Sequence, residues 1–314
     1  MNSKPHASSW LYFQVVFATA VWGSAYPFTK QLVTEISPLS IITVRALIGA
    51  LLLVFLSGSR LKAADFRPSF LWKLFIMSLL GVSAQQYVQA YALKYTQASH
   101  AGLLIASTPI LIAGLMAALG EKLGPFKIAA FLLGFIGTVL VMFSKNGSVA
   151  LSLPSTRGDI VFVSSCFAWA FYVILTKKWL TFWPQAKVTT VTMLVALLSV
   201  LPFWLAAGGP AELARLSARG WAGLGYLSVF SSAFAYLFWN NSVEGLGPVK
   251  SSYFIYLEPF TTLLSAYLLL GESIAPAAFA GGLLILAGVY FVGINGKNRD
   301  FTVAKSRKEA ERHA

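Results

Sequence analysis

The sequence predicts an all-α integral membrane protein in which ten transmembrane helices form two inverted five-helix repeats. Three observations lead to this fold class. Apolar residues make up 57% of the 314 residues and charged residues only 11%, whereas an ordinary soluble domain has about 25% charged residues. Long uncharged runs approach the roughly 20 residues that cross a hydrocarbon core of about 30 Å. Motifs of the first half of the chain recur, in the same order, in the second half.

The ten helices are predicted from the uncharged runs, because lipid must solvate apolar surface that a body of this size cannot bury. The first run lacks the cleavage site of a removable signal, so we expect it to stay in the mature chain. Continuous rather than alternating hydrophobicity excludes barrel strands. The fifth and sixth runs are the shortest. We expect helices at residues 10–29, 38–57, 74–93, 101–119, 128–144, 160–176, 188–207, 220–243, 251–270 and 275–294.

The net charge of +13 is explained by membrane topology, and we expect no nucleic-acid partner. With the amino terminus inside, inner segments carry Lys4, Arg60, Lys62, Arg67, Lys73, Lys122, Lys127, Lys177, Lys178, Lys187, Lys250 and the basic tail. Outer segments carry only Lys30, Lys94, Lys145, Arg157, Arg215 and Arg219. Basic residues favour the cytoplasmic side of short loops. The sequence therefore predicts a multi-pass protein of the inner (plasma) membrane with both termini cytoplasmic.

The recurring motifs divide the chain into two repeats. "WGSAYPFTK" at 22–30 is matched by "WAFYVILTK" at 169–177, and "STPILIAGLMAALGEKL" at 107–123 by "LEPFTTLLSAYLLLGESI" at 257–274. Each of the latter pair reads Pro, apolar helix, Gly-Glu. We expect a first repeat over 1–147, a second over 148–296, and a basic cytoplasmic tail over 297–314.

Five is an odd number of helices, so the two repeats must enter the membrane from opposite sides. Inverted repeats are the architecture of secondary transporters, in which two halves exchange conformations and expose a site near the membrane midplane to each side in turn. The repeat therefore favours a carrier that works by alternating access.

Several motifs together resemble the EamA-type family of the drug/metabolite transporter superfamily. They are Trp-Gly at residues 22–23, Arg45 inside the second helix, the Pro and Gly-Glu around the fourth, and "EPFTTLLSAYLLLGE" around the ninth. The resemblance covers nearly the whole chain. It implies an inner-membrane carrier that exports or exchanges small metabolites such as amino acids, with relatives that move nucleotide sugars, sugar phosphates or cationic drugs.

Arg45 and Glu258 are the two charges inside the predicted spans, and both should face protein or water because charge in lipid is costly. By helix rise they differ in height by roughly 10 Å, so we assume no direct bridge. Arg45 either binds substrate or bonds backbone carbonyls or a loop carboxylate. Glu258 either couples transport to protons or cations, or is a neutral acid beside Pro259.

Polar and aromatic residues on several helix faces suit a mixed cavity for a small organic molecule; their alternative role is interhelical hydrogen bonding or packing. Few buried cations favour amino acids or related neutral, zwitterionic or aromatic substrates over phosphorylated ones. Pro109 and Pro259 are candidate gating bends. The candidate substrate-binding residues are Trp22, Tyr26, Arg45, Ser78, Gln85, Gln89, Trp169, Tyr172, Ser232, Tyr236, Trp239, Asn240, Tyr256 and Glu258.

The chain carries no catalytic signature. Cys166 is the one cysteine and His100 the one histidine near a predicted span, and acid–base chemistry needs a paired constellation. We therefore expect neither an enzyme nor a bound metal or cofactor. The expected partners are the lipid bilayer and a small-molecule substrate, with the chain a monomer or weak homodimer. The alternatives are a multidrug or other metabolite carrier working by uptake or exchange and, more remotely, a membrane-embedded enzyme.

Overall fold

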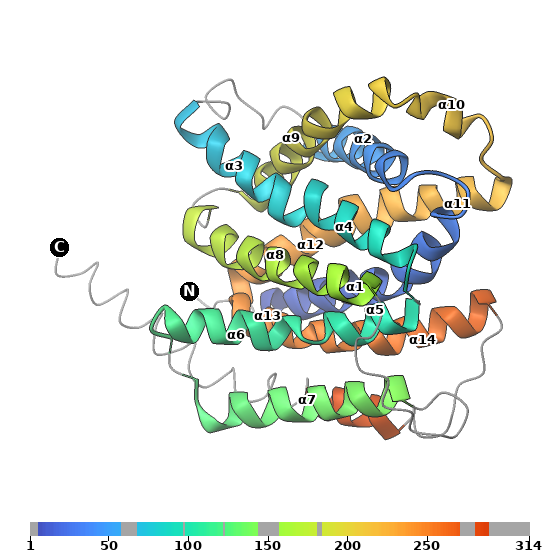
Figure 1. Cartoon of the computed structure of the whole chain (residues 1–314). Helices are drawn as coiled ribbons and strands as arrows, with labels where there is room; N and C mark the ends of the chain where they lie inside the picture. Colours follow the sequence, from blue (N-terminus) through green and yellow to red (C-terminus); the bar gives the residue numbers. More distant parts are fainter. Residues whose placement is uncertain are drawn as a thin grey trace.

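The computed structural model describes residues 6–57, 68–96, 98–121, 123–143, 157–180, 184–270 and 280–288, and all regular secondary structure there is helical (Figure 1). Residues 280–288 are also helical. The labelled elements are α1 (His6–Leu32), α2 (Pro38–Ser57), α3 (Pro68–Gly81), α4 (Ser83–Leu93), α5 (Ala98–Ile105), α6 (Thr108–Ala118), α7 (Pro125–Phe143), α8 (Arg157–Leu180), α9 (Gln185–Ala206), α10 (Gly209–Leu213), α11 (Ala218–Tyr226), the π-helix η4 (Leu227–Phe234), α12 (Ala235–Leu246), α13 (Pro248–Ser252), the 3₁₀-helix η5 (Tyr253–Tyr256) and α14 (Leu257–Leu270).

Four described helices have the length and hydropathy needed to cross a bilayer. They are Pro38–Leu56, Arg157–Trp179, Gln185–Ala206 and the continuous stretch Ala218–Leu246, and Thr108–Ala118 and Ile128–Gly137 are shorter apolar helices. Large apolar side chains also cover much of the outer surface: Phe55 is 82% exposed, Leu268 70% and Phe203 69%. A surface of this kind is stable when lipid is its solvent.

Four of the helices expected to be continuous are interrupted, and the interruption in the eighth is the π-helix η4. The third is divided at Val82, whose φ of −128° and ψ of −72° lie outside helical geometry, into α3 and α4. The fourth is divided into α5 and α6, and the ninth contains the 3₁₀-helix η5. Pro109 and Pro259 both lie in the first turn of the helix that follows such an interruption. Proline is tolerated there because the first N–H groups of a helix have no intrahelical partner.

The fifth and sixth helices are longer than their apolar runs. In place of 128–144 and 160–176, the structure has α7 with 19 residues and α8 with 24 residues. α8 continues through polar ends, from Arg157 at its start to Lys178 near its end. Of the tenth predicted helix only 280–288 is described; the connector from 148 to 156, Glu272 and the tail from 297 to 314 lie outside the described residues.

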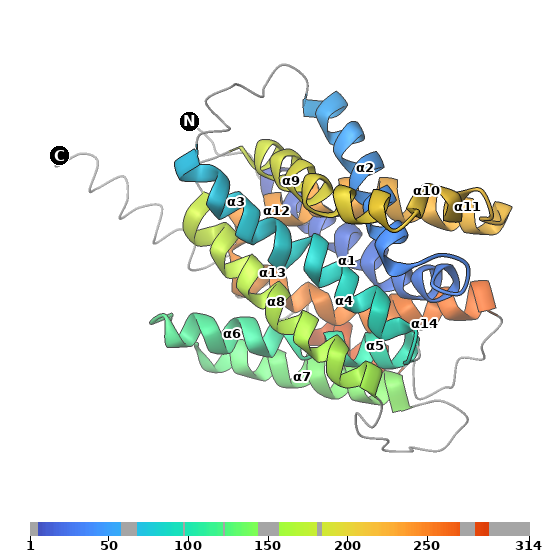
Figure 2. The same cartoon turned by 45° about the horizontal axis from the view of Figure 1, so that its top comes forward.

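α1 and α12 lie in the middle of the bundle, with α2 and α9 packed together on one side and α7 on the opposite side (Figures 1 and 2). α1 makes its most extensive contact with α14. That contact is close because Gly23 has no side chain: a Cβ there would overlap the backbone of Glu258 and the hydroxyl of Thr261. The Thr262 hydroxyl donates to the Gly23 carbonyl oxygen at 2.8 Å. Gly23 therefore fixes the position of Glu258 relative to α1.

Gly23→Ala should lower the free energy of unfolding by about 1–3 kcal/mol, the usual cost of inserting a methyl group into a packed interior. Thermal unfolding in detergent measures this. The matched control is Gly225→Ala in α11, where an added Cβ meets no atom within 4 Å and alanine favours the helix by about 1 kcal/mol. Equal melting temperatures for the two variants would contradict the packing argument.

Candidate functional site

A polar cavity of about 50 Å³ lies between α1, α2, α4, α5, α8, η4, α12 and α14. One enclosed water needs about 10–15 Å³, so the cavity has room for a few waters. Clefts that hold organic ligands measure roughly 300–1,000 Å³, so an organic ligand requires the walls to move apart. The lining residues are Trp22, Ala25, Tyr26, Thr29, Arg45, Gln85, Gln86, Gln89, Ala90, Leu93, Ile105, Trp169, Ser231, Tyr236 and Glu258.

The structure brings more than half of the candidate residues together on this cavity. Those that line it are Trp22, Tyr26, Arg45, Gln85, Gln89, Trp169, Tyr236 and Glu258. The candidates that do not line it are Ser78, Tyr172, Ser232, Trp239, Asn240 and Tyr256. They are distributed behind its walls, where most of them form interhelical hydrogen bonds or ring contacts.

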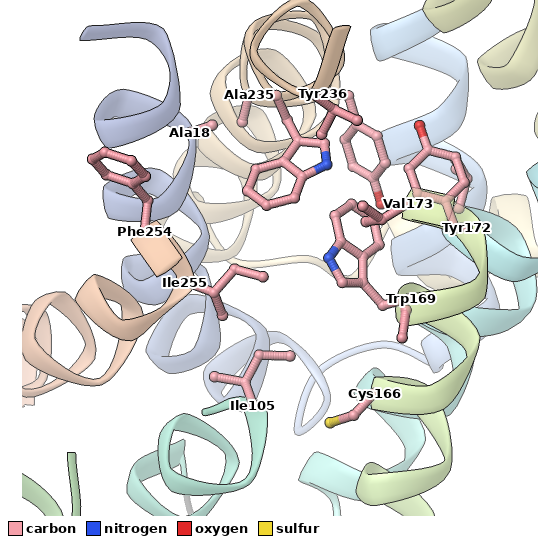
Figure 3. Packing of buried hydrophobic residues seen from close by; sticks show 14 of the residues in the cluster. Ala18, Ile105, Cys166, Trp169, Tyr172, Val173, Ala235, Tyr236, Phe254 and Ile255 are labelled. Atoms are coloured by element: carbon pink, nitrogen blue, oxygen red, sulfur yellow. The ribbon is translucent and has the colours of Figure 1, made fainter. Parts of the chain in front are cut away.

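Aromatic rings from both sequence repeats meet at one wall of the cavity. The rings of Trp22 and Trp169 lie edge to face with centroids 5.0 Å apart, and Tyr236 lies 5.3 Å from Trp22 and 5.7 Å from Trp169. Figure 3 shows Trp169 and Ile105 pointing into the same space from α8 and α5. Edge-to-face contacts stabilise the rings beyond their buried area. The three rings therefore hold one another in fixed orientations along this wall.

Arg45 is buried in this cavity, with 8% of its surface exposed. Its Nε donates to the Ser232 hydroxyl and its Nη2 to the Ser231 hydroxyl, each at 3.0 Å. Within the described part of the chain no carboxylate pairs with it. A guanidinium has five N–H donors, and these two bonds leave others to face the cavity. Arg45 is thus a buried cation held in place by neutral groups.

Both serines belong to the π-helix η4, which interrupts the long helix between α11 and α12. The indole Nε1 of Trp22 donates to the backbone oxygen of Ser231 at 3.0 Å. π-Helical turns are rare and occur frequently at functional sites. Here the π segment supplies the partners of the buried cation and of one aromatic wall residue.

Glu258 lies in the first turn of α14 and is 3% exposed. The Tyr26 hydroxyl donates to its Oε2 at 3.0 Å, and Oε1 accepts no hydrogen bond from the described residues. The structure records no ion pair between Glu258 and Arg45, although both line the cavity. The guanidinium of Arg45 and the carboxyl group of Glu258 therefore face one space without a direct bond between them.

Gln85, Gln86 and Gln89 of α4 form another wall. The buried Gln85 Oε1 has no hydrogen-bond partner among the residues that the structure describes. Gln86, which sequence reasoning missed, donates from Nε2 to the Tyr236 hydroxyl at 2.8 Å, and that hydroxyl donates in turn to the Gly81 carbonyl. The helical spacing of 85 and 89 picks out one face, and Gln86 lies about 100° around the helix from it. The sequence did contain a signal for Gln86, because a glutamine next to Gln85 indicates that the polar surface of α4 is wider than one helix face.

Tyr172, Asn240 and Ser78 join helices behind the wall. The Tyr172 hydroxyl donates to Asn240 Oδ1 at 2.9 Å, and Asn240 Nδ2 donates to the Thr189 hydroxyl at 2.9 Å, which connects α8, α12 and α9. The Ser78 hydroxyl donates to the Thr192 carbonyl oxygen at 2.8 Å. For these three residues the structure favours the interhelical role that the sequence left open.

Ser232, Trp239 and Tyr256 also lie behind the cavity walls. Ser232 holds Arg45, and the Trp239 ring packs 5.4 Å from Trp22. Tyr256 is buried beside Gly134, where a Cβ would overlap its ring. Ser231, a lining residue that the sequence did not single out, is the serine next to a candidate. No pattern in the chain distinguishes the two serines.

Comparison with known proteins gives the family. The EamA-like transporter family matches the chain twice, over residues 9–143 and 156–294. An uncharacterized transporter of Archaeoglobus fulgidus is 28% identical over 92% of this chain and 97% of its own. Protein PecM of Dickeya dadantii is 25% identical over 94% of both chains, and a WAT1-related protein of Arabidopsis thaliana is 26% identical over 73% of this chain and 72% of its own.

A solved crystal structure has the same fold, with a TM-score of 0.69, 18% sequence identity, and coverage of 90% of this chain and 96% of the other. The double match, one per half of the chain, agrees with the motif repetition and confirms the predicted resemblance. The chain belongs to the EamA-like transporter family, and is a membrane transporter rather than an enzyme.

Proposed function

We propose that this transporter is a secondary carrier for amino acids or related neutral, zwitterionic or aromatic compounds, and that it exports them across the inner membrane by alternating access. One observation carries the proposal: a buried cation and a buried carboxylate line a single cavity without pairing. A zwitterion supplies the missing partner of each charge, its carboxylate for Arg45 and its ammonium group for Glu258.

The rest of the lining fits this substrate class. The faces of Trp22 and Trp169 offer apolar surface to a side chain and an attractive surface to a cation. A phosphorylated substrate usually requires several Lys or Arg side chains, and Arg45 is the one such residue in the lining. Carboxylate recognition by a single arginine is therefore the better match.

Matched contacts in the two halves support alternating access by inverted repeats. α1 packs on α12 and α14, while α8, its counterpart, packs on α4 and α6. Lys30 at the end of α1 donates to the carbonyl oxygens of Leu93 and Thr96 at 2.6 and 2.9 Å. Lys177 of α8 donates to the Glu244 carbonyl at 3.2 Å. Equivalent contacts of this kind are expected when two halves are related by a two-fold axis in the membrane plane.

In liposomes loaded with labelled amino acids, the purified protein should release neutral and aromatic amino acids faster than protein-free liposomes do. Loaded sugar phosphates serve as the negative control, because the cavity has one arginine. Efflux is followed by filtration. Retention of every amino acid, or release of sugar phosphates instead, would contradict this substrate class.

Arg45→Gln should weaken amino-acid binding by about 10- to 100-fold, the loss expected when a hydrogen-bonded charge pair worth roughly 1.5–3 kcal/mol is removed. Competition by the matching amine, which lacks the carboxylate, should hardly change. Arg215→Gln, at an exposed position outside the cavity, is the matched control. An equal loss for the amino acid and the amine would show that Arg45 acts on the fold rather than on the carboxylate.

The inverted topology requires the connector and the chain ends to lie on opposite sides of the membrane. Cys166 is the one cysteine and is buried, so single cysteines are easily introduced in a Cys166→Ala background. In whole cells Ser148→Cys should react with an impermeant thiol reagent added outside. Ser3→Cys and Ser306→Cys should react only after permeabilisation. Labelling of all three from the same side would rule out inverted insertion.

A further inference from the structure

The Glu258 carboxyl group lines the cavity and has only one neutral hydrogen-bond donor among the described residues. Among the described residues it is the one carboxylate that lines the cavity, and its single partner is the neutral Tyr26 hydroxyl. Burying a carboxylate without a cation costs several kcal/mol, and one neutral hydrogen bond offsets part of that cost. An empty cavity therefore favours the protonated acid, and a cation in the cavity favours the carboxylate.

A second observation marks the place of that cation. Gln85 lines the same cavity, and its buried Oε1 accepts no hydrogen bond from the described residues. Buried acceptors are nearly always paired, so this oxygen has the capacity to accept a hydrogen bond from a bound group. An ammonium group has three N–H donors. Glu258, Gln85 and the aromatic faces together form a set of acceptors for it.

Among the described side chains, no lysine, arginine or histidine pairs with Glu258. The described side chains of α5 and α7, which also pack on α14, include no charged group. Arg45 of α2 lines the cavity without an ion pair to Glu258. Among the described residues, the titratable groups that interact electrostatically with Glu258 are Tyr26 of α1, Cys166 of α8 and Tyr236 of α12, and none of them is a cation.

We propose that Glu258 is a shared site for a proton and for the ammonium group of the substrate, so that each displaces the other. This inference rests on the proposed function, because it requires a substrate with an amino group. On the loading side the zwitterion binds and the carboxyl proton leaves to water. On the opposite side the zwitterion dissociates and the carboxylate takes up a proton from that side. One proton thus moves against each substrate molecule, and an inward proton gradient drives export.

Two liposome assays with one labelled amino acid separate this coupling from transport itself. The first measures exchange of labelled for unlabelled substrate at equal pH, and the second measures accumulation driven by an imposed pH gradient. The wild type should do both. Glu258→Gln should continue exchange at about 10-fold higher substrate concentration, since the amide oxygen still accepts a hydrogen bond, and should no longer respond to the gradient. Gradient-driven accumulation by Glu258→Gln would overturn the proposal.

Tyr26→Phe keeps the test decisive if Glu258→Gln fails to fold. Removal of the Tyr26 hydroxyl takes away the hydrogen bond that stabilises the ionised form of Glu258. Protons should then compete with the substrate for Glu258 more effectively. The pH at which substrate affinity falls by half should therefore rise by about one unit. Tyr226→Phe is the matched control, because that hydroxyl contacts Ser24 of α1 at 2.6 Å and lies outside the cavity lining. Its midpoint should equal that of the wild type.

The outcomes distinguish the two proposals. Absence of amino-acid movement in both assays means that the proposed function is wrong. Exchange without any response to the gradient in the wild type means that the carrier function holds and the shared site is wrong. An unchanged pH midpoint in Tyr26→Phe, or an equal shift in Tyr226→Phe, also overturns the shared site.

Discussion

Two ionisable groups, Arg45 and Glu258, that are held apart inside an apolar bundle are the constraint on which the rest of this structure depends. A charge at the centre of a membrane helix costs about 2.5–3.5 kcal/mol even by insertion measurements, and direct pairing of Arg45 with Glu258 would recover part of that cost. The structure instead gives Arg45 two serine hydroxyls and Glu258 one tyrosine hydroxyl. Neutral partners fix both groups and leave each with unused hydrogen-bonding capacity toward the cavity.

The scaffold around the cavity explains how the two charges stay in place. Gly23 lets α14 approach α1 so closely that the backbone of Glu258 has little freedom, and Gly49 lets α2 approach η4, with its Cβ position 3.3 Å from Ser232. Small residues perform this role in membrane proteins because helix association there depends on close packing and on hydrogen bonds between helices. Arg45 therefore lies about one helical turn from the close contact at Gly49, and Glu258 lies directly at the close contact with Gly23.

Much of this could be predicted from the sequence, for physical reasons. Uncharged runs indicate where a chain avoids water, so the pattern of these runs predicted most of the helices, and it singled out Arg45 and Glu258, which are both buried. The ends of α8 were not predicted, because the helix continues into polar residues at both ends. Hydropathy indicates which residues avoid water and not where helical backbone hydrogen bonding stops. The interruption at Val82 directly follows Gly81, and a single glycine in an apolar run does not by itself predict a break. Gln86 and Ser231 were missed because one helical period selects one face, whereas a cavity between several helices receives side chains from more than one.

The π-helix η4 has a consequence for how the bundle can rearrange. Bonding from residue i to i+5 accommodates extra residues, compared with an α-helix, within the same length. A return of η4 to α-helical bonding would shift α12, which follows it, by one residue along the helix. A shift of one residue corresponds to a rotation of about 100° about the helix axis. Tyr236 and Trp239 follow η4 directly in α12, so a slip of one residue would turn the aromatic wall away from Trp22. A change of register in η4 would therefore move the aromatic wall and the serine partners of Arg45 together.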